Sequence, residues 1–183
     1  MAKLVVTAIG RDRAGLVSAL AAAVAEAGGN WLEAQMARLA GSFAGIVLVD
    51  IADDKVGALE ASARGLGAEG VLDVSLRPAY ADEAEPVTAG EQLHVFVLGH
   101  DRPGIVREVA STLADLGASI VELQTRTLHA PMGDGLLFEA DADVIVPPGV
   151  GEEALRTALE ALSADFVVDV EVASDEAEGL PAS

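Results

Sequence analysis

One segment occurs twice in this chain. Residues 10–39 read GRDRAGLVSALAAAVAEAGGNWLEAQMARL and residues 99–128 read GHDRPGIVREVASTLADLGASIVELQTRTL, so the second copy lies 89 positions after the first. The copies align without a gap, and they agree at positions that include Gly10/Gly99, Asp12/Asp101, Arg13/Arg102, Gly15/Gly104, Val17/Val106, Gly28/Gly117, Glu33/Glu122 and Gln35/Gln124. Because one offset holds over a turn, a helix and a strand, the chain contains two copies of one domain.

The composition limits what each copy can be. The 183 residues give each copy roughly 80–90 residues, enough for a small domain with a modest core. No apolar run reaches the ~18 residues of a membrane span, and the N-terminus MAKLVVTAIGRD is expected to be a first strand and not a signal peptide. The absence of cysteine excludes disulfides, a thiol nucleophile and a thiolate metal site. We therefore expect a cytoplasmic protein without a membrane segment.

The chain is strongly acidic. Its net charge is −19, and the part up to residue 85 carries 7 basic and 12 acidic residues against 4 and 18 in the remainder. Neither half offers the lysines and arginines that neutralise phosphates, so direct nucleic-acid binding is excluded. Solubility is the simplest role for such a charge. The alternative is a docking surface for a basic partner, such as a DNA-binding regulator.

Hydrophobic periodicity predicts the same elements in both copies. Apolar residues recur at helical spacing, and each helix is expected to end at a left-handed glycine, Gly28 or Gly117. Residues of the following strand alternate between polar and apolar. Expected strands are 3–9, 31–37, 43–51 and 71–76, then 93–98, 121–126, 136–146 and 166–172, and the second helices are 55–66 and 152–163.

The order strand, helix, two strands, helix, strand occurs twice. This predicts an α+β protein of two tandem ferredoxin-like βαββαβ domains. We expect domain 1 at residues 1–78, a linker at 79–92, domain 2 at 93–173 and a disordered acidic tail at 174–183.

The most specific element is the turn between the first strand and the first helix. It reads Gly10-Arg11-Asp12-Arg13-Ala14-Gly15-Leu16-Val17, and then Gly99-His100-Asp101-Arg102-Pro103-Gly104-Ile105-Val106. Glycine permits a sharp turn and close approach, proline suits a first helical turn, and free N–H groups at a helix start can hold a carboxylate. Alternatively, Asp12 and Asp101 cap their own helices and bind nothing. On the residues alone, capping is the more common outcome.

The segment Asp101-Arg102-Pro103-Gly104-Ile105-Val106 in a βαββαβ unit resembles the signature of ACT domains, which are small amino-acid-sensing regulatory modules. The first copy, Asp12-Arg13-Ala14-Gly15-Leu16-Val17, keeps the pattern with Ala14 in place of proline. Gly28-Gly29-Asn30 is similar to the family's helix-exit segment, whose asparagine helps to hold the ligand's main-chain groups. The second copy has Ser119 there.

This resemblance implies the ligand site. Its residues would be Asp12, Arg13, Ala14, Gly15, Leu16, Asn30, Asp101, Arg102, Pro103, Gly104, Ile105 and Ser119. The turn amides would hold the carboxylate of a small amino acid, with glycine or serine as the expected ligand. The aspartates, Asn30 and Ser119 would contact its ammonium or other polar groups.

A chain of two such domains is similar to the glycine cleavage system transcriptional repressor group, whose members act on a DNA-binding activator and do not bind DNA themselves. The resemblance implies a non-catalytic regulator with a regulatory protein partner, no cofactor, paired units and a homodimer. A scaffold that binds no metabolite is the alternative.

Other reactive residues form no recognisable catalytic or metal motif. The three histidines, His94, His100 and His129, have no metal-ligand spacing. Glu139, Asp141 and Asp143 alternate on one strand face and are expected to form a solvated stripe. Trp31 is expected in an interface or on the open face of the sheet.

Overall fold

The structure is a computed structural model that describes residues 1–79, 90–130 and 135–173. The expected disordered tail and most of the expected linker lie outside the described residues. The chain forms two compact units, one on each side of the segment 80–89.

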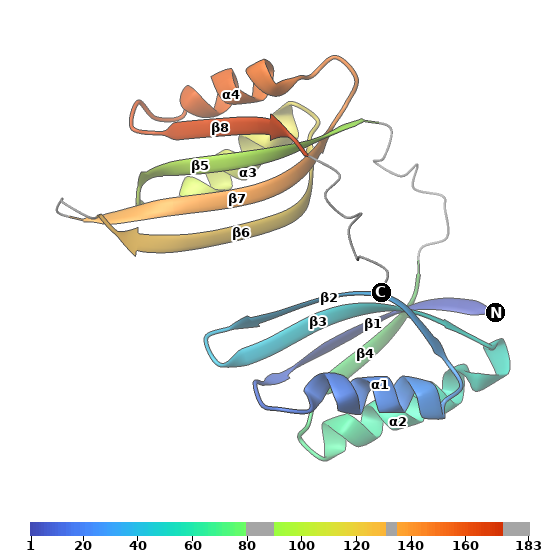
Figure 1. Ribbon diagram of the computed structural model, residues 1–183. Helices are drawn as coiled ribbons and strands as arrows, with labels where there is room; N and C mark the ends of the chain where they lie inside the picture. Colours follow the sequence, from blue (N-terminus) through green and yellow to red (C-terminus); the bar gives the residue numbers. More distant parts are fainter. Residues whose placement is uncertain (80–89, 131–134, 174–183) are drawn as a thin grey trace, which may run out of the picture. The chain divides into compact units, whose positions relative to one another are not determined.

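The two units have the same order of elements (Figure 1). Unit 1 consists of β1 (Ala2–Arg11), α1 (Leu16–Glu26), β2 (Asn30–Leu39), β3 (Ser42–Ile51), the short 3-10 helix η1 (Asp53–Lys55), α2 (Val56–Ala68) and β4 (Asp73–Pro78). Unit 2 consists of β5 (Glu91–His100), α3 (Ile105–Asp115), β6 (Ser119–His129), β7 (Leu136–Val146), α4 (Glu152–Glu160) and β8 (Val167–Val172). The antiparallel sheets have the orders β2-β3-β1-β4 and β6-β7-β5-β8, which confirms two tandem ferredoxin-like domains.

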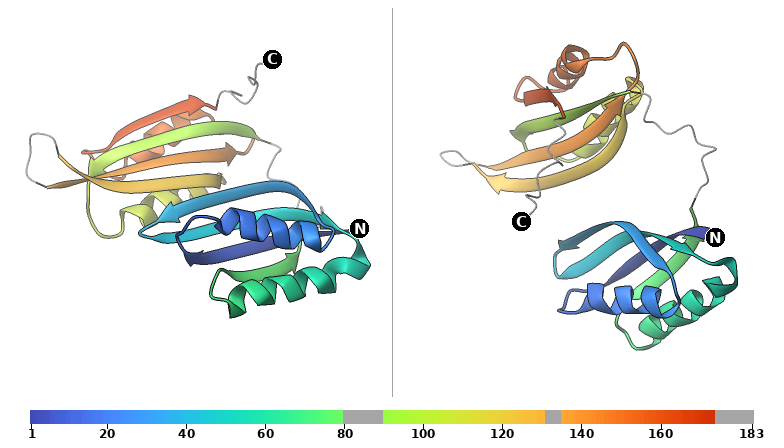
Figure 2. Two further views of the ribbon diagram at one scale, coloured as in Figure 1. Left: turned by 60° about the horizontal axis from the view of Figure 1, so that its bottom comes forward. Right: turned by 45° about the vertical axis from the view of Figure 1, so that its right-hand side comes forward.

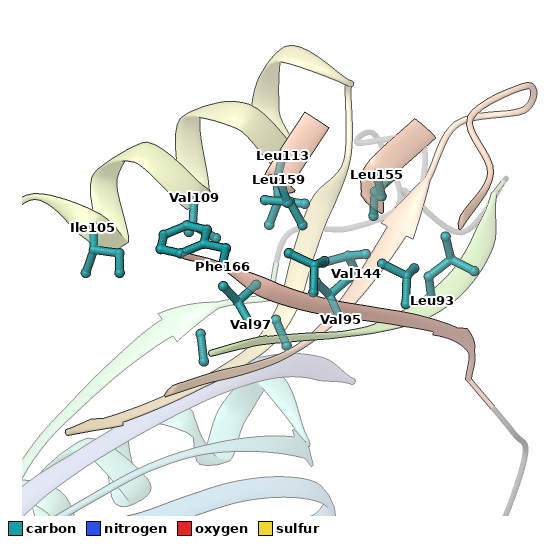
Figure 3. Packing of buried hydrophobic residues seen from close by; sticks show 14 of the residues in the cluster. Leu93, Val95, Val97, Ile105, Val109, Leu113, Val144, Leu155, Leu159 and Phe166 are labelled. Carbon is teal, nitrogen blue, oxygen red and sulfur yellow. The ribbon is translucent and has the colours of Figure 1, made fainter. Parts of the chain in front are cut away.

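Both helices of each unit cover one face of its sheet, as the views in Figure 2 show. Strand residues on that face are buried and alternate with exposed ones, for example Leu4, Val6 and Ala8 along β1. In unit 2, Leu113 and Leu155 come down from α3 and α4 onto the sheet (Figure 3). Each unit thus has its own hydrophobic core.

The central strands are longer than the sequence predicts. Strands β1 and β5 continue through Gly10 and Gly99, because β3 and β7 pair with them as far as Arg11 and His100. A Cβ at Gly10 would lie 2.9 Å from the carbonyl oxygen of Val71, and one at Gly99 would lie 2.5 Å from Cδ1 of Phe166. Close approach, and not a turn, therefore requires glycine at these two positions.

The boundaries of several other elements also shift. Strand β5 begins at Glu91, two residues inside the range expected as linker. Helix α2 begins at Val56, after η1, and α4 ends at Glu160, three residues earlier than expected. The edge strands β4 and β8 start at Asp73 and Val167, because they pair only with β1 and β5.

The first helix of each unit ends as predicted. Gly28 and Gly117 have φ values of 77° and 73°, and each donates its N–H to a carbonyl three residues back. The next residue donates across five residues, from Gly29 to Val24 and from Ala118 to Leu113. This is the Schellman arrangement, which satisfies carbonyls of the last turn.

A β-bulge overturns the expected side of Trp31. Trp31 pairs with Val49, but Glu33 pairs with Leu48, so one extra residue separates them on β2. From the bulge onward, each side chain of β2 lies on the opposite face of the sheet from the one that regular alternation with Trp31 predicts. Trp31 therefore packs against the core under the helices, while Glu33 and Gln35 lie on the opposite face. Strand β6 has the matching bulge between Ile120 and Glu122.

The helix-free faces of the two sheets differ in chemistry. In unit 1 this face carries Val5, Ile9, Ile46 and Leu48 in its middle, with Glu33, Gln35 and Asp73 on its edge strands, and Ile9 is 56% exposed. In unit 2 the strand positions that match Ala44, Ile46 and Leu48 are occupied by carboxylates. The carboxylates on this face are Glu122, Glu139, Asp141, Asp143, Asp169 and Glu171, and they surround Phe96 and Leu98 of β5. We call the two surfaces the apolar open face and the acidic open face.

Within the ranges that the structure describes, the helices are too short or too polar to span a bilayer.

Candidate ligand-binding site

The turn between the first strand and first helix has the same backbone in both units. Gly15 and Gly104 each have φ 90° with ψ near zero, and each immediately precedes the first helical residue. This left-handed conformation favours glycine, which accounts for its repetition. Pro103 lies before Gly104 and so stands outside the helix, contrary to the expectation that it occupies the first helical turn.

The aspartates of the turn do not cap the helices. Among the described residues, no side chain accepts a hydrogen bond from the first turn of α1 or α3. The first intrahelical bonds that α1 and α3 make to these glycines run from Ala19 N–H to Gly15 and from Glu108 N–H to Gly104. Residues before these have N–H groups that the helix itself cannot satisfy. The capping alternative is therefore wrong for both turns.

A cavity of about 480 Å³ opens beside the turn of unit 1. The turn supplies one wall, and the β2–β3 hairpin supplies the other. Its lining consists of Asp12, Arg13, Gly15, Leu16, Val17, Ser18, Met36, Ala37, Arg38 and Phe43. The hairpin lies here because β1 pairs with β3 up to Arg11 opposite Ser42, and Asp12 donates its N–H to the carbonyl of Gly41 at 2.9 Å.

A second cavity, of about 460 Å³, occupies the same place in unit 2. Its lining consists of Asp101, Arg102, Gly104, Ile105, Val106, Thr125, Arg126, Thr127 and Phe138. We call the two spaces cavity 1 and cavity 2.

Eight of the twelve residues expected at the site line a cavity, four in each unit. Asp12, Arg13, Gly15 and Leu16 line cavity 1, and Asp101, Arg102, Gly104 and Ile105 line cavity 2. Ala14 and Pro103 are in the turns but do not line the cavities. Asn30 and Ser119 begin β2 and β6 after the far end of an eleven-residue helix, so neither lies beside the turn of its own unit.

Sequence reasoning missed the wall that the hairpin supplies. Arg38 and Phe43 in cavity 1, and Arg126 and Phe138 in cavity 2, come from β2, β3, β6 and β7. The signal was available, because the third strand pairs with the first in a ferredoxin-like unit and returns its hairpin to the turn.

Ion pairs differ between the cavities. In cavity 1, Arg38 lies 3.6 Å from Asp12. In cavity 2, Arg102 donates to Glu108 of α3 through both terminal nitrogens, and Arg126 donates through Nε to Glu139. The hydrogen bond from Arg102 lowers the pKa of Glu108 and raises that of Arg102, while the bond to Glu139 raises the pKa of Arg126.

His94 lies on the acidic open face, between Asp143 of β7 and Glu171 of β8. Its Nδ1 is 3.1 Å from Asp143, and its Nε2 is 3.6 Å from Asp141. The hydrogen bond with Asp143, together with the negative charges of Asp141 and Glu171, raises the pKa of His94. The stripe expected from Glu139, Asp141 and Asp143 therefore has specific cationic partners. Within the described ranges, no set of three His, Asp or Glu side chains is arranged to hold a metal ion.

Comparison with known proteins agrees with the fold and its duplication. A family model described as ACT domain matches residues 2–77 and 91–173. A crystal structure of an unknown protein from Galdieria sulphuraria is 30% identical, with a TM-score of 0.79 over 94% of this chain and 99% of that one. A putative glycine cleavage system transcriptional repressor is 19% identical, with a TM-score of 0.69 over 94% of this chain and 98% of that one. Among curated proteins, none matches this sequence.

Proposed function

Because this chain belongs to the ACT domain family, we propose that it is a non-catalytic cytoplasmic regulator that binds a small amino acid and transmits its presence to a partner protein. Glycine or serine is the proposed ligand. The name of the 19% identical relative, a putative glycine cleavage system transcriptional repressor, motivates both that choice and a transcriptional regulator as the partner.

The observation that carries the proposal is the cavity beside the turn. It combines N–H groups at a helix start, which the helix itself cannot bond, with charged side chains of both signs, Asp12 and Arg13 in cavity 1. An amino acid also presents both signs, as a carboxylate and an ammonium group. Leu16, Met36 and Phe43 supply an apolar wall for a small side chain.

The acidic open face supports protein contact as the output. Six carboxylates share this surface with His94 and Arg126 as the cations on its strands. A basic surface on the partner would be complementary, and charge complementarity accelerates and orients association. The edge strands β2, β4, β6 and β8 offer a route to the proposed homodimer.

A thermal-shift screen against the common amino acids tests the proposal. A ligand that binds only the folded state stabilises it by ~2.7 kcal/mol at a hundredfold excess over its Kd. We expect a saturable rise in melting temperature with glycine or serine. Arg13→Ala should weaken the response, whereas Arg64→Ala, on α2 and outside the cavity lining, should preserve it.

A folded sample that shows no shift with any amino acid at millimolar concentration would favour the scaffold alternative. Partner binding is tested separately, by a pull-down from native lysate with the full chain as bait. Failure to recover a transcriptional regulator would contradict the proposed output without affecting the ligand site.

A further inference from the structure

Cavities 1 and 2 occupy equivalent places, and one of the differences between them is an acidic residue beside cavity 2. Subtracting the offset of 89 places Arg102 at the position of Arg13 and Glu108 at the position of Ala19. Both Ala19 and Glu108 lie in the first helical turn, close to the turn glycine. Unit 2 therefore contains a carboxylate that unit 1 lacks.

In unit 2 this carboxylate forms an ion pair with Arg102. Nη1 of Arg102 donates to Oε1 of Glu108 at 2.8 Å, and Nη2 donates to Oε2. Such a two-bond pair uses the fork of donors with which arginine binds carboxylates. Glu108 thus takes the place that a ligand carboxylate would take on Arg102.

In unit 1 the arginine has no such partner. The ion pairs among the described residues include Asp12 with Arg38, but none involves Arg13, although Arg13 lines cavity 1. Its guanidinium therefore remains available to an anion entering the cavity.

The difference between the cavities lies in how their arginines are paired and not in the sum of their lining charges. Cavity 1 is lined by one aspartate and two arginines, Asp12, Arg13 and Arg38, which sum to +1. The charged residues that line cavity 2, Asp101, Arg102 and Arg126, also sum to +1, but Arg102 is paired with Glu108 and Arg126 with Glu139 of the acidic open face. A ligand carboxylate would therefore have to displace Glu108 from Arg102 in cavity 2, whereas in cavity 1 it would meet Arg13, which has no ion-pair partner among the described residues.

We propose that Glu108 is a specificity-determining residue that closes cavity 2 to carboxylates, so that an amino acid binds through its carboxylate at cavity 1 alone. The inference rests on the proposed function and narrows it, because one chain then binds one amino acid and not two. Unit 2 retains the fold of a sensor with an internal carboxylate in the ligand's place.

Exchanging the two residues between the units tests this directly. The full-length ¹⁵N-labelled chain is titrated with glycine, and separately with acetate, which presents the carboxylate alone, while backbone amide shifts are followed. In the wild type, amides of residues 15–18 should shift saturably and those of 104–107 should not. Glu108→Ala should add a saturable shift of amides 104–107. Ala19→Glu should weaken the affinity measured from amides 15–18 by about tenfold or more, which is the contribution of one charged hydrogen bond.

Glu153→Ala serves as the matched control, because it removes an exposed carboxylate from the first turn of α4 and should create no new response. The amide spectra also report whether each variant is folded. Equal affinities at both turns of the wild type would overturn the inference while leaving the proposed function intact, and so would Glu108→Ala without a gained response. If neither glycine nor acetate shifts either turn, the inference and an amino-acid site at these turns are both wrong.

Discussion

Two glycine-to-alanine substitutions in unit 1 should have opposite effects on stability. Gly15 and Gly65 are both exposed, and a Cβ built at either would have no neighbouring atom within 4 Å. Steric conflict with the surroundings therefore contributes at neither position. The backbone differs, because Gly15 has φ 90° and Gly65 lies inside α2. Any difference between the variants must come from conformation.

The magnitudes follow from that difference. A non-glycine residue in a left-handed conformation costs about 1–2 kcal/mol. Glycine in a helix interior costs about 0.5–1 kcal/mol relative to alanine. We therefore expect Gly15→Ala to destabilise unit 1 by about 1–2 kcal/mol and Gly65→Ala to stabilise it by about 0.5–1 kcal/mol. For a domain of this size, 1 kcal/mol corresponds to roughly 4–8 °C in Tm.

The assay is urea denaturation followed by tryptophan fluorescence. Trp31 is the single tryptophan of the chain and packs against the core of unit 1, so its emission follows the unfolding of that unit. Gly104→Ala changes the equivalent turn of unit 2 and is the control for the probe, since it should leave the Trp31 transition in place. Changes of the same sign in the free energy of unfolding for Gly15→Ala and Gly65→Ala would refute the reasoning.

Two further predictions concern unit 2. The pKa of His94 is raised above its ordinary value of 6.5 by the hydrogen bond with Asp143, so the stability gained from the charged imidazole is full below pH 6.5 and is lost as the pH rises through the higher folded-state pKa. An NMR titration should show this high midpoint, and Asp143→Asn should lower it; an unchanged midpoint would contradict the assignment. Gly99→Ala should cost about 1–3 kcal/mol by overpacking, because the new Cβ would meet Phe166 at 2.5 Å. Urea denaturation followed by far-UV circular dichroism measures that cost. A variant as stable as the wild type would contradict the prediction and show that the ring of Phe166 moves aside freely.

The sequence predicted the topology and the helix ends well, because these depend on local chemistry. Apolar spacing located α1 and α3, and Gly28 and Gly117 supply the positive φ that ends them. The side chosen for Trp31 was wrong because a bulge changes the alternation, and the residues of β2 alone do not reveal where an extra residue is inserted.

The candidate site was predicted in part for a similar reason. The turn residues are contiguous, so a motif identifies them. The hairpin wall, with Arg38 and Arg126, depends on how β3 and β7 return to the turn. The pairing of Arg102 with Glu108 spans a left-handed glycine, and that geometry was not evident before the structure.

The contrast between the open faces has a consequence for handling the two halves as separate polypeptides. Unit 1 would present Ile9, Ile46 and their apolar neighbours to water, on the half with the smaller net charge, 7 basic and 12 acidic residues against 4 and 18. Unit 2 would present a surface of like charges that repel other copies. We expect the first half to precipitate or oligomerise at concentrations at which the second stays dispersed. The two copies of one fold should therefore differ in solubility.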